Sequence, residues 1–201
     1  MALDRTNMVS LLDIGALTGS TEKLAEMGDG YTELTEDWGP NTESKQYVNM
    51  KNASNTVKGY AFSMTPSREY LSDDMQTAID TMFKTFPTGD KCNTHYYRFY
   101  KTDIKSGTGD CIRLPVTVCP SSTGGSGGDT LTSSIQINGN GEVEQGTITI
   151  GAGGTFTWKK KEDAASAGSK ESVLIKTISI FGTRTSLSRP GLREDGNDGR
   201  Y

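Results

Sequence analysis

Apolar and polar residues alternate along much of this chain, a pattern typical of β-strands. The clearest case is segment 111–119, where Ile112, Leu114, Val116 and Val118 occupy every second position and would share one face of a strand. Similar patterns predict further strands at 31–36, 46–50, 56–64, 95–102, 131–137, 142–150, 155–159 and 173–181. The sequence therefore predicts a mainly β domain.

Two local features indicate how some of these strands are arranged. Pro115 has no amide hydrogen to donate to a ladder, so the strand 111–119 is expected to lie at a sheet edge or to carry a bulge. The turn sequence Asn138-Gly139-Asn140-Gly141 is a strong hairpin signal. It predicts that segments 131–137 and 142–150 pair with each other.

One segment, 73–86, has helical periodicity. Ser72 is expected to cap its N-terminus, Asp73 and Asp74 complement the helix dipole there, and Pro87 ends it. The apolar stripe predicted to pack against the sheet consists of Met75, Ile79, Met82, Phe83 and Phe86.

Composition favours long loops around a modest core. Only 33% of the 201 residues are hydrophobic and 24 are glycine, so partner subunits are expected to complete the burial. We expect an extended N-terminal arm at 1–30, one domain at 31–181 and a polar tail at 182–201 that is disordered alone or orders against a partner. No apolar run reaches the roughly 20 residues of a membrane span, and no secretory signal is seen, so folding is expected in the cytosol.

The residues that usually carry chemistry are sparse. His95 is the sole histidine, and no phosphate-binding loop or nucleophile motif accompanies it. The three cysteines, Cys92, Cys111 and Cys119, are expected to be reduced, and a pair eight residues apart on one strand is too far apart to bond. We therefore expect no catalytic, cofactor-binding or metal site. With a net charge of −4 and no basic stripe, tight binding to nucleic acid is not expected either.

The order of several segments resembles the major tail tube proteins of long-tailed bacteriophages, of the type found in phages of Gram-positive bacteria. Each motif is weak, and their order and spacing over about residues 28–158 carry the resemblance. The segments are 29–34, 40–49, 59–60, 67–70, the helix with its acidic start, 84–90, 95–100, 112–118, 124–128, 131–137 and 144–147.

The resemblance implies a β-sandwich or barrel with one flanking helix, long loops and extended terminal arms. It implies six-membered rings of this chain, stacked into a tube in the virion tail after assembly in the host cytoplasm. DNA would pass through the tube without specific binding, other tail proteins would sit at the tube ends, and an arm and a long loop would bridge subunits. Relatives in contractile tails and bacteriocins fit the same pattern.

Glu142 and Glu144 are the candidate lumen residues, because they are expected on a strand without an obvious Lys or Arg on the same face. Both are equally compatible with an ordinary solvated outer surface. An alternative function is a β-sandwich adhesion or carbohydrate-binding module of a virion or related particle, which would present exposed aromatic residues from a monomer.

Overall fold

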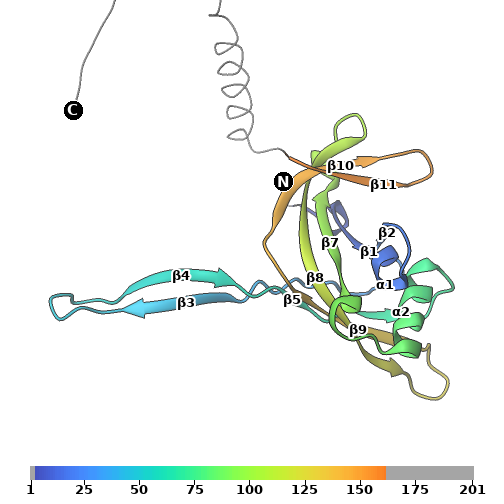
Figure 1. The fold of residues 1–201 in the computed structure, drawn as a ribbon, viewed down its shortest axis with the longest axis horizontal. Coiled ribbons are helices and arrows are strands. Elements are labelled where there is room, and N and C mark those ends of the chain that lie inside the picture. The colour runs from blue at the N-terminus through green and yellow to red at the C-terminus, as the bar shows by residue number, and fades with distance from the viewer. Residues whose placement is uncertain (1–2, 162–201) are drawn as a thin grey trace, which may run out of the picture. The chain divides into compact units, whose positions relative to one another are not determined.

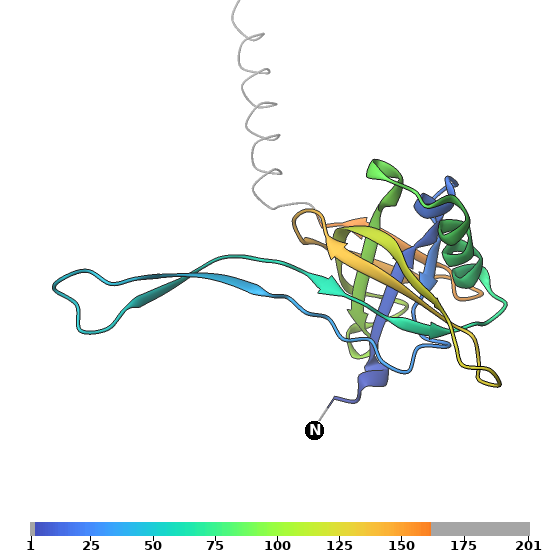
Figure 2. The same cartoon turned by 90° about the horizontal axis from the view of Figure 1, so that it is seen from below.

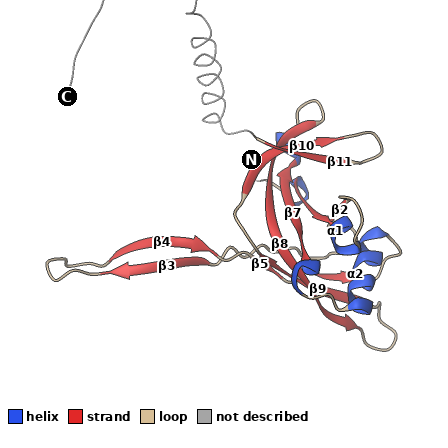
Figure 3. Ribbon diagram, in the orientation of Figure 1, coloured by secondary structure: helices blue, strands red, loops and turns tan. Residues whose placement is uncertain are grey.

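A computed structural model describes residues 3–161 of the chain, and these form a mainly β unit with two short α-helices (Figure 3). The mainly β fold class expected from the alternation is confirmed. The expected strand 173–181 and the polar tail 182–201 lie outside the described residues.

The main sheet has nine strands, and its central path runs in the order β11-β10-β8-β7-β1-β2 with antiparallel neighbours (Figure 1). Strands β5, β6 and β9 belong to the same sheet, because β9 pairs with β8 on one side and with β5 and β6 on the other. The strands are β1 (Met8–Asp13), β2 (Leu24–Glu26), β5 (Ser63–Met64), β6 (Ser67–Glu69), β7 (Asn93–Tyr100), β8 (Thr108–Gly124), β9 (Thr132–Gly139), β10 (Glu144–Ile150) and β11 (Phe156–Lys160). The remaining elements are β3 (Pro40–Lys45), β4 (Ser54–Tyr60), the helices α1 (Ile14–Thr18) and α2 (Asp74–Thr85), and 3₁₀ turns at Arg5–Asn7, Gly89–Cys92 and Lys101–Asp103.

Strand β8 is central in the sheet rather than an edge strand, which corrects the first of the two alternatives based on Pro115. The second alternative, a bulge, is found in β8, but between Pro120 and Ser122 rather than at Pro115. On one side β8 pairs with β7, and on the other it pairs with β10 up to Arg113 and with β9 from Val116 onward. The carbonyl of Pro115 accepts a hydrogen bond from Asn140 on that second side, so its missing N–H group points the same way. Pro115 is tolerated because it occupies the gap between two successive partner strands.

The Asn-Gly sequence at 138–141 does not form a hairpin. Strands β9 and β10 do not pair with each other; they follow one another along the same edge of β8. The actual hairpin turn is the glycine-rich segment 125–131 between β8 and β9. The prediction of a β9–β10 hairpin was wrong because β8, with 17 residues, is long enough to pair first with β10 and then with β9.

The N-terminal segment expected to be an extended arm contains strand β1. Val9, Leu11 and Leu12 are buried, and β1 pairs with β7 and β2. Five consecutive residues of this strand are buried, so no alternation of apolar and polar residues marks it in the sequence.

Apolar side chains form two clusters. The larger lies where α2 covers the sheet and includes Met75, Ile79, Val116 and Ile137; the smaller is built from β1, β7, β10 and neighbouring strands around Tyr97. At Gly146 in β10, an added Cβ would lie 2.6 Å from the Trp158 ring. This close approach allows Trp158 of β11 to pack against the smaller cluster.

Helix α2 agrees with the expected segment except at its two ends. Its N-cap is Asp73, whose carboxylate accepts from the backbone N–H of Gln76 at 2.8 Å, rather than Ser72. Met75 and Ile79 are buried and Phe83 is half-buried against the larger cluster. Phe86, expected in the buried stripe, is 67% exposed, because it is the C-cap residue with φ of 43° and no longer follows the helical spacing.

Candidate assembly surface

Strands β3 and β4 form a two-stranded hairpin that is separate from the main sheet. Figures 1 and 2 both show it extending away from that sheet. The sequence predicts strands at 46–50 and 56–64. In the structure β3 already begins at Pro40, and residues 46–50 belong to the tip of the hairpin. A lone hairpin is only marginally stable in water, and β3 and β4 pair with no other strand of residues 3–161.

The tip of the hairpin exposes apolar side chains. Tyr47 is 63% exposed, Val48 is fully exposed and Met50 is 38% exposed. Lys45 and Lys51 flank this group and are also exposed. Clustered apolar side chains on a protruding segment are typical of an interaction site.

Beside the backbone ladder, one ion pair, Glu43 with Lys58, connects the two hairpin strands, and a second, Glu43 with Lys45, lies within β3. The Glu43 carboxylate contacts Lys58 Nζ at 2.8 Å and Lys45 Nζ at 3.1 Å. Hydrogen bonds from Lys58 and then Lys45 lower the pKa of Glu43 below its ordinary value. Because these groups are exposed, their attraction weakens with added salt, so it aligns the strands without making the hairpin rigid.

The root of the hairpin is fixed to the sheet through Glu36. Its carboxylate accepts hydrogen bonds from Tyr96 Oη at 2.6 Å, Arg98 Nη1 at 2.7 Å and Trp38 Nε1 at 3.0 Å. Asp37 and Ser63 also exchange two backbone hydrogen bonds, of 2.8 and 2.9 Å. The hairpin therefore combines an anchored base with a solvent-exposed tip.

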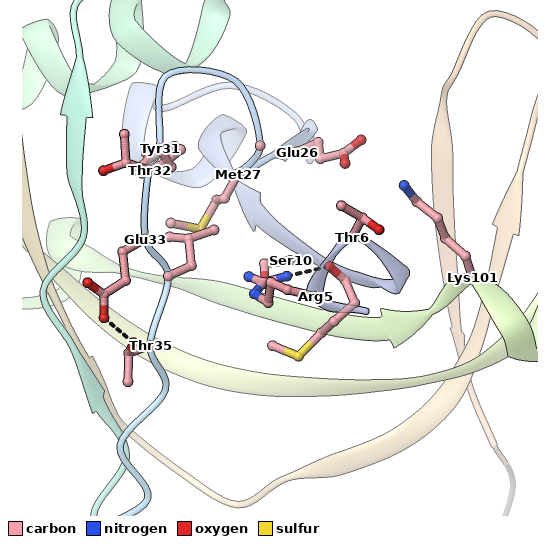
Figure 4. Close-up of a pocket in the computed structure, with 13 residues that line it drawn as sticks. Arg5, Thr6, Ser10, Glu26, Met27, Tyr31, Thr32, Glu33, Thr35 and Lys101 are labelled. Atoms are coloured by element: carbon pink, nitrogen blue, oxygen red, sulfur yellow. Dashed lines mark hydrogen bonds between the residues drawn. The ribbon is translucent and has the colours of Figure 1, made fainter. Parts of the chain in front are cut away.

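A groove of about 450 Å³ lies between the N-terminal turn and segment 26–35 (Figure 4). Its lining includes two positively charged side chains, Arg5 and Lys101, and two carboxylates, Glu26 and Glu33. Arg5 donates to the Met8 carbonyl at 2.6 Å, and Thr35 donates to Glu33 at 2.7 Å. No histidine or cysteine is among the lining residues.

One wall of the groove is supported by a buried arginine. Arg68 is 2% exposed, bonds to Asp73 in an ion pair, and donates to Gln76 Oε1 at 3.2 Å and to the Asp29 carbonyl at 3.1 Å. Its guanidinium lies 5.5 Å from the centroid of the Tyr31 ring. Burial raises the pKa of Tyr31 to about 12. This network ties segment 29–31 to β6 and to the start of α2.

The two carboxylates proposed from the sequence have different environments. Glu144 in β10 contacts Lys160 Nζ at 2.7 Å and accepts from Arg113 Nε at 2.6 Å, and these partners lower its pKa. The expectation that Glu144 has no basic partner was therefore wrong, because the register of β8, β10 and β11 brings Arg113 and Lys160 to it. Glu142 precedes β10 and is exposed.

The single histidine of the chain lies in strand β7. Burial, and then the nearby Arg113, lower the pKa of His95. Its ring is tilted by 49° to that of Tyr97, and the two ring centroids are 6.3 Å apart. Over this range no group of three or more His, Cys, Asp or Glu side chains is placed to hold a metal ion. None of the helices described is long and apolar enough to cross a membrane.

Comparison with known proteins shows the fold at low sequence identity. No family model and no curated protein matches the chain. Among solved structures, a chain of the virion of a native gene transfer agent particle matches with a TM-score of 0.50 and 9% identity, over 72% of this chain and 98% of the other. A chain of the tail of an empty gene transfer agent particle, refined with C6 symmetry, matches with a TM-score of 0.50 and 13% identity, over 71% and 97%. The chain thus shares the fold of proteins from phage-like tailed particles.

Proposed function

We propose that this chain is a structural protein of the tail of a phage or phage-like particle, and that it forms six-membered rings that stack into a tube for genome delivery. The observation that carries the proposal is the β3–β4 hairpin, whose root is anchored through Glu36 and whose apolar tip is solvent-exposed. The fold shared with a chain from a C6-symmetric tail supports it.

The hairpin supplies the kind of contact that builds a tube. A tip that packs on a different surface of the next copy makes a heterologous contact, which closes into rings or propagates into filaments. Burying Tyr47, Val48 and Met50 in this way would offset the entropy lost when the hairpin becomes ordered. Other tail proteins would cap the ends of the tube, and no enzymatic role is proposed.

An adhesion or carbohydrate-binding module would instead be monomeric and would present aromatic side chains on a stable platform. The exposed Tyr47 and Tyr60 belong to the hairpin, which pairs with no other strand of residues 3–161. The other exposed aromatic side chains of this range, Tyr70 after β6 and Phe86 at the end of α2, lie on separate segments. This placement favours the assembly function.

Negative-stain microscopy and mass photometry of the purified full-length chain over a concentration series test the proposal. We expect rings at moderate concentration and tubes at high concentration. Val48→Asp should leave the subunit folded but block stacking, because it would bury a charge in the contact. Asn52→Asp adds the same charge to the same hairpin outside the apolar group and is the matched control. Monomers alone for the unmodified protein under every condition would refute the proposal.

A further inference from the structure

Two of the three cysteines lie next to each other at one end of the β7–β8 ladder. Cys92 ends the 3₁₀ turn before β7, and Cys119 lies in β8. The last pair of the ladder is Asn93 with Thr117, one residue after Cys92 and two residues before Cys119. A regular ladder continued to these two positions, with strands about 5 Å apart and a rise of about 3.3 Å per residue, would have a Cα separation of about 6 Å. Disulfides require about 4.4–6.8 Å.

The local backbone also permits the two side chains to meet. In a regular ladder, positions 92 and 119 would face opposite sides of the sheet, but Cys92 belongs to a 3₁₀ turn and does not follow that alternation. The hydrogen bond from Thr117 Oγ1 to Asn93 Oδ1, at 2.9 Å, fixes the register beside the cysteines. Cys92 Sγ donates to the Pro87 carbonyl at 3.0 Å, and burial and then the nearby Cys119 thiol raise the pKa of Cys92.

We propose that Cys92 and Cys119 are a latent disulfide pair, which stays reduced in a thiol-rich compartment and closes when the folded protein meets a disulfide oxidant. Cys119 is half-buried whereas Cys92 is buried, so an oxidant reaches Cys119 first. The bond would join the turn that follows α2 to the long strand β8 and close a loop between two segments of the sheet.

The chemistry is ordinary thiol–disulfide exchange. The Cys119 thiolate attacks a small disulfide such as oxidised glutathione, which forms a mixed disulfide and releases one glutathione thiolate. Cys92 then loses its proton to solvent and attacks Cys119 Sγ, which forms the Cys92–Cys119 bond and releases the second glutathione. Two cysteine thiols are oxidised and one glutathione disulfide is reduced. Because the pKa of Cys92 is raised, closure should be slow near neutral pH and faster as pH rises.

Cys111 is an internal control. Cys111 lies near the other end of β8 and is buried, with 4% of its surface exposed. Its thiol donates to the Ile112 carbonyl at 3.3 Å, and burial raises its pKa to about 12. Its position eight residues from Cys119 along one strand puts it about 26 Å away, so it cannot compete for the bond.

The test is native-state oxidation of the full chain with oxidised glutathione, followed by alkylation, trypsin digestion and mass spectrometry. Trypsin cuts after Arg98 and Arg113 and so separates the two cysteines. We expect one linked peptide pair containing Cys92 and Cys119, with Cys111 alkylated after denaturation. The oxidised protein should melt roughly 5–10 °C higher than the reduced protein, because the bond restricts the unfolded chain.

Cys119→Ser should abolish both the linked peptide and the rise in melting temperature, whereas Cys111→Ser should retain both. If either variant folds poorly, the peptide map of the unmodified protein decides the question without it. Three alkylatable thiols after prolonged native oxidation, or a bond that involves Cys111 or a second chain, would overturn the proposal. The outcome is independent of whether the chain forms tubes.

Discussion

At the scale of single residues, Glu36 is the carboxylate on which the hairpin root depends. Its side chain is 6% exposed and accepts hydrogen bonds from Trp38, Tyr96 and Arg98. Its replacement would leave the Arg98 guanidinium and two neutral donors without their acceptor.

Glu36→Ala should lower the free energy of unfolding by about 2–4 kcal/mol, somewhat less than for a fully buried pair because Arg98 is partly solvated. Glu33→Ala is the control: Glu33 is an exposed carboxylate of the same segment, and its loss should change stability by at most about 0.5 kcal/mol. Urea denaturation measures both. Equal effects of the two substitutions would show that Glu36 does not anchor the root.

Asp73 gives the protein a pH dependence of predictable sign. Burial acts to raise its pKa, but the Arg68 hydrogen bond and the backbone N–H groups of Gln76 and Met75 outweigh it, so the pKa of Asp73 lies below 3.8. The unfolded chain therefore takes up a proton at Asp73 before the folded chain does. The stability from this group is fully present above pH 3.8 and is lost as pH falls through the folded-state value.

Asp73→Asn should consequently flatten the fall of stability below about pH 4, while asparagine preserves a good N-cap. Asp74→Asn changes the next residue, whose carboxylate forms an exposed ion pair with Lys23, and should alter the profile less. Denaturant unfolding at a series of acidic pH values provides the measurement. An unchanged profile for Asp73→Asn would mean that the Arg68 contact contributes no pH-dependent stability.

At the scale of elements, the apolar stripe predicted for helix α2 contains both buried residues, such as Ile79, and an exposed one, Phe86. Ile79 is 2% exposed, so Ile79→Ala should cost about 2–5 kcal/mol through lost burial and a residual cavity. Phe86→Gly should cost nothing, because Phe86 is exposed and its positive φ suits glycine. Thermal melts of the two variants compare them directly, and a large loss at Phe86 would contradict the exposed C-cap.

Helices and strands can be predicted from the sequence where only one of their faces is buried, because apolar and polar residues then alternate regularly. They are missed where both faces are buried. Helix α2 and strands β7 and β8 carry clear patterns, whereas β1 is buried on successive residues and resembles an irregular segment. The turn sequence at 138–141 gave a wrong prediction of a hairpin, because the residues of a turn contain no information on the length of the neighbouring strand β8. Likewise, the partners of Glu144 come from β8 and β11, whose register no local pattern encodes.

At the scale of the whole molecule, the proposed tube must let a polyanion slide through it without gripping it. Affinity for DNA comes chiefly from arrays of Lys and Arg that displace counterions. Each chain has a net charge of −4, so six copies in a ring carry about −24. We therefore propose an acidic lumen. Of the two carboxylates named from the sequence, Glu142 stays a candidate for its lining, whereas Arg113 and Lys160 neutralise Glu144.

The structure decides which of these two carboxylates can be tested by charge reversal. Lysine at position 144 would face Arg113 and Lys160 and would disturb the fold, whereas Glu142 is exposed.

Unmodified tubes should show no measurable binding to duplex DNA at moderate salt. Glu142→Lys should leave tube assembly intact but slow genome delivery, because six added cations would attract the phosphates, and Glu142→Gln should have a smaller effect. Electron microscopy checks assembly, and the rate of DNA release from particles measures delivery. Tight binding of DNA by unmodified tubes would contradict the acidic lumen, and an unchanged release rate for Glu142→Lys would place Glu142 outside it.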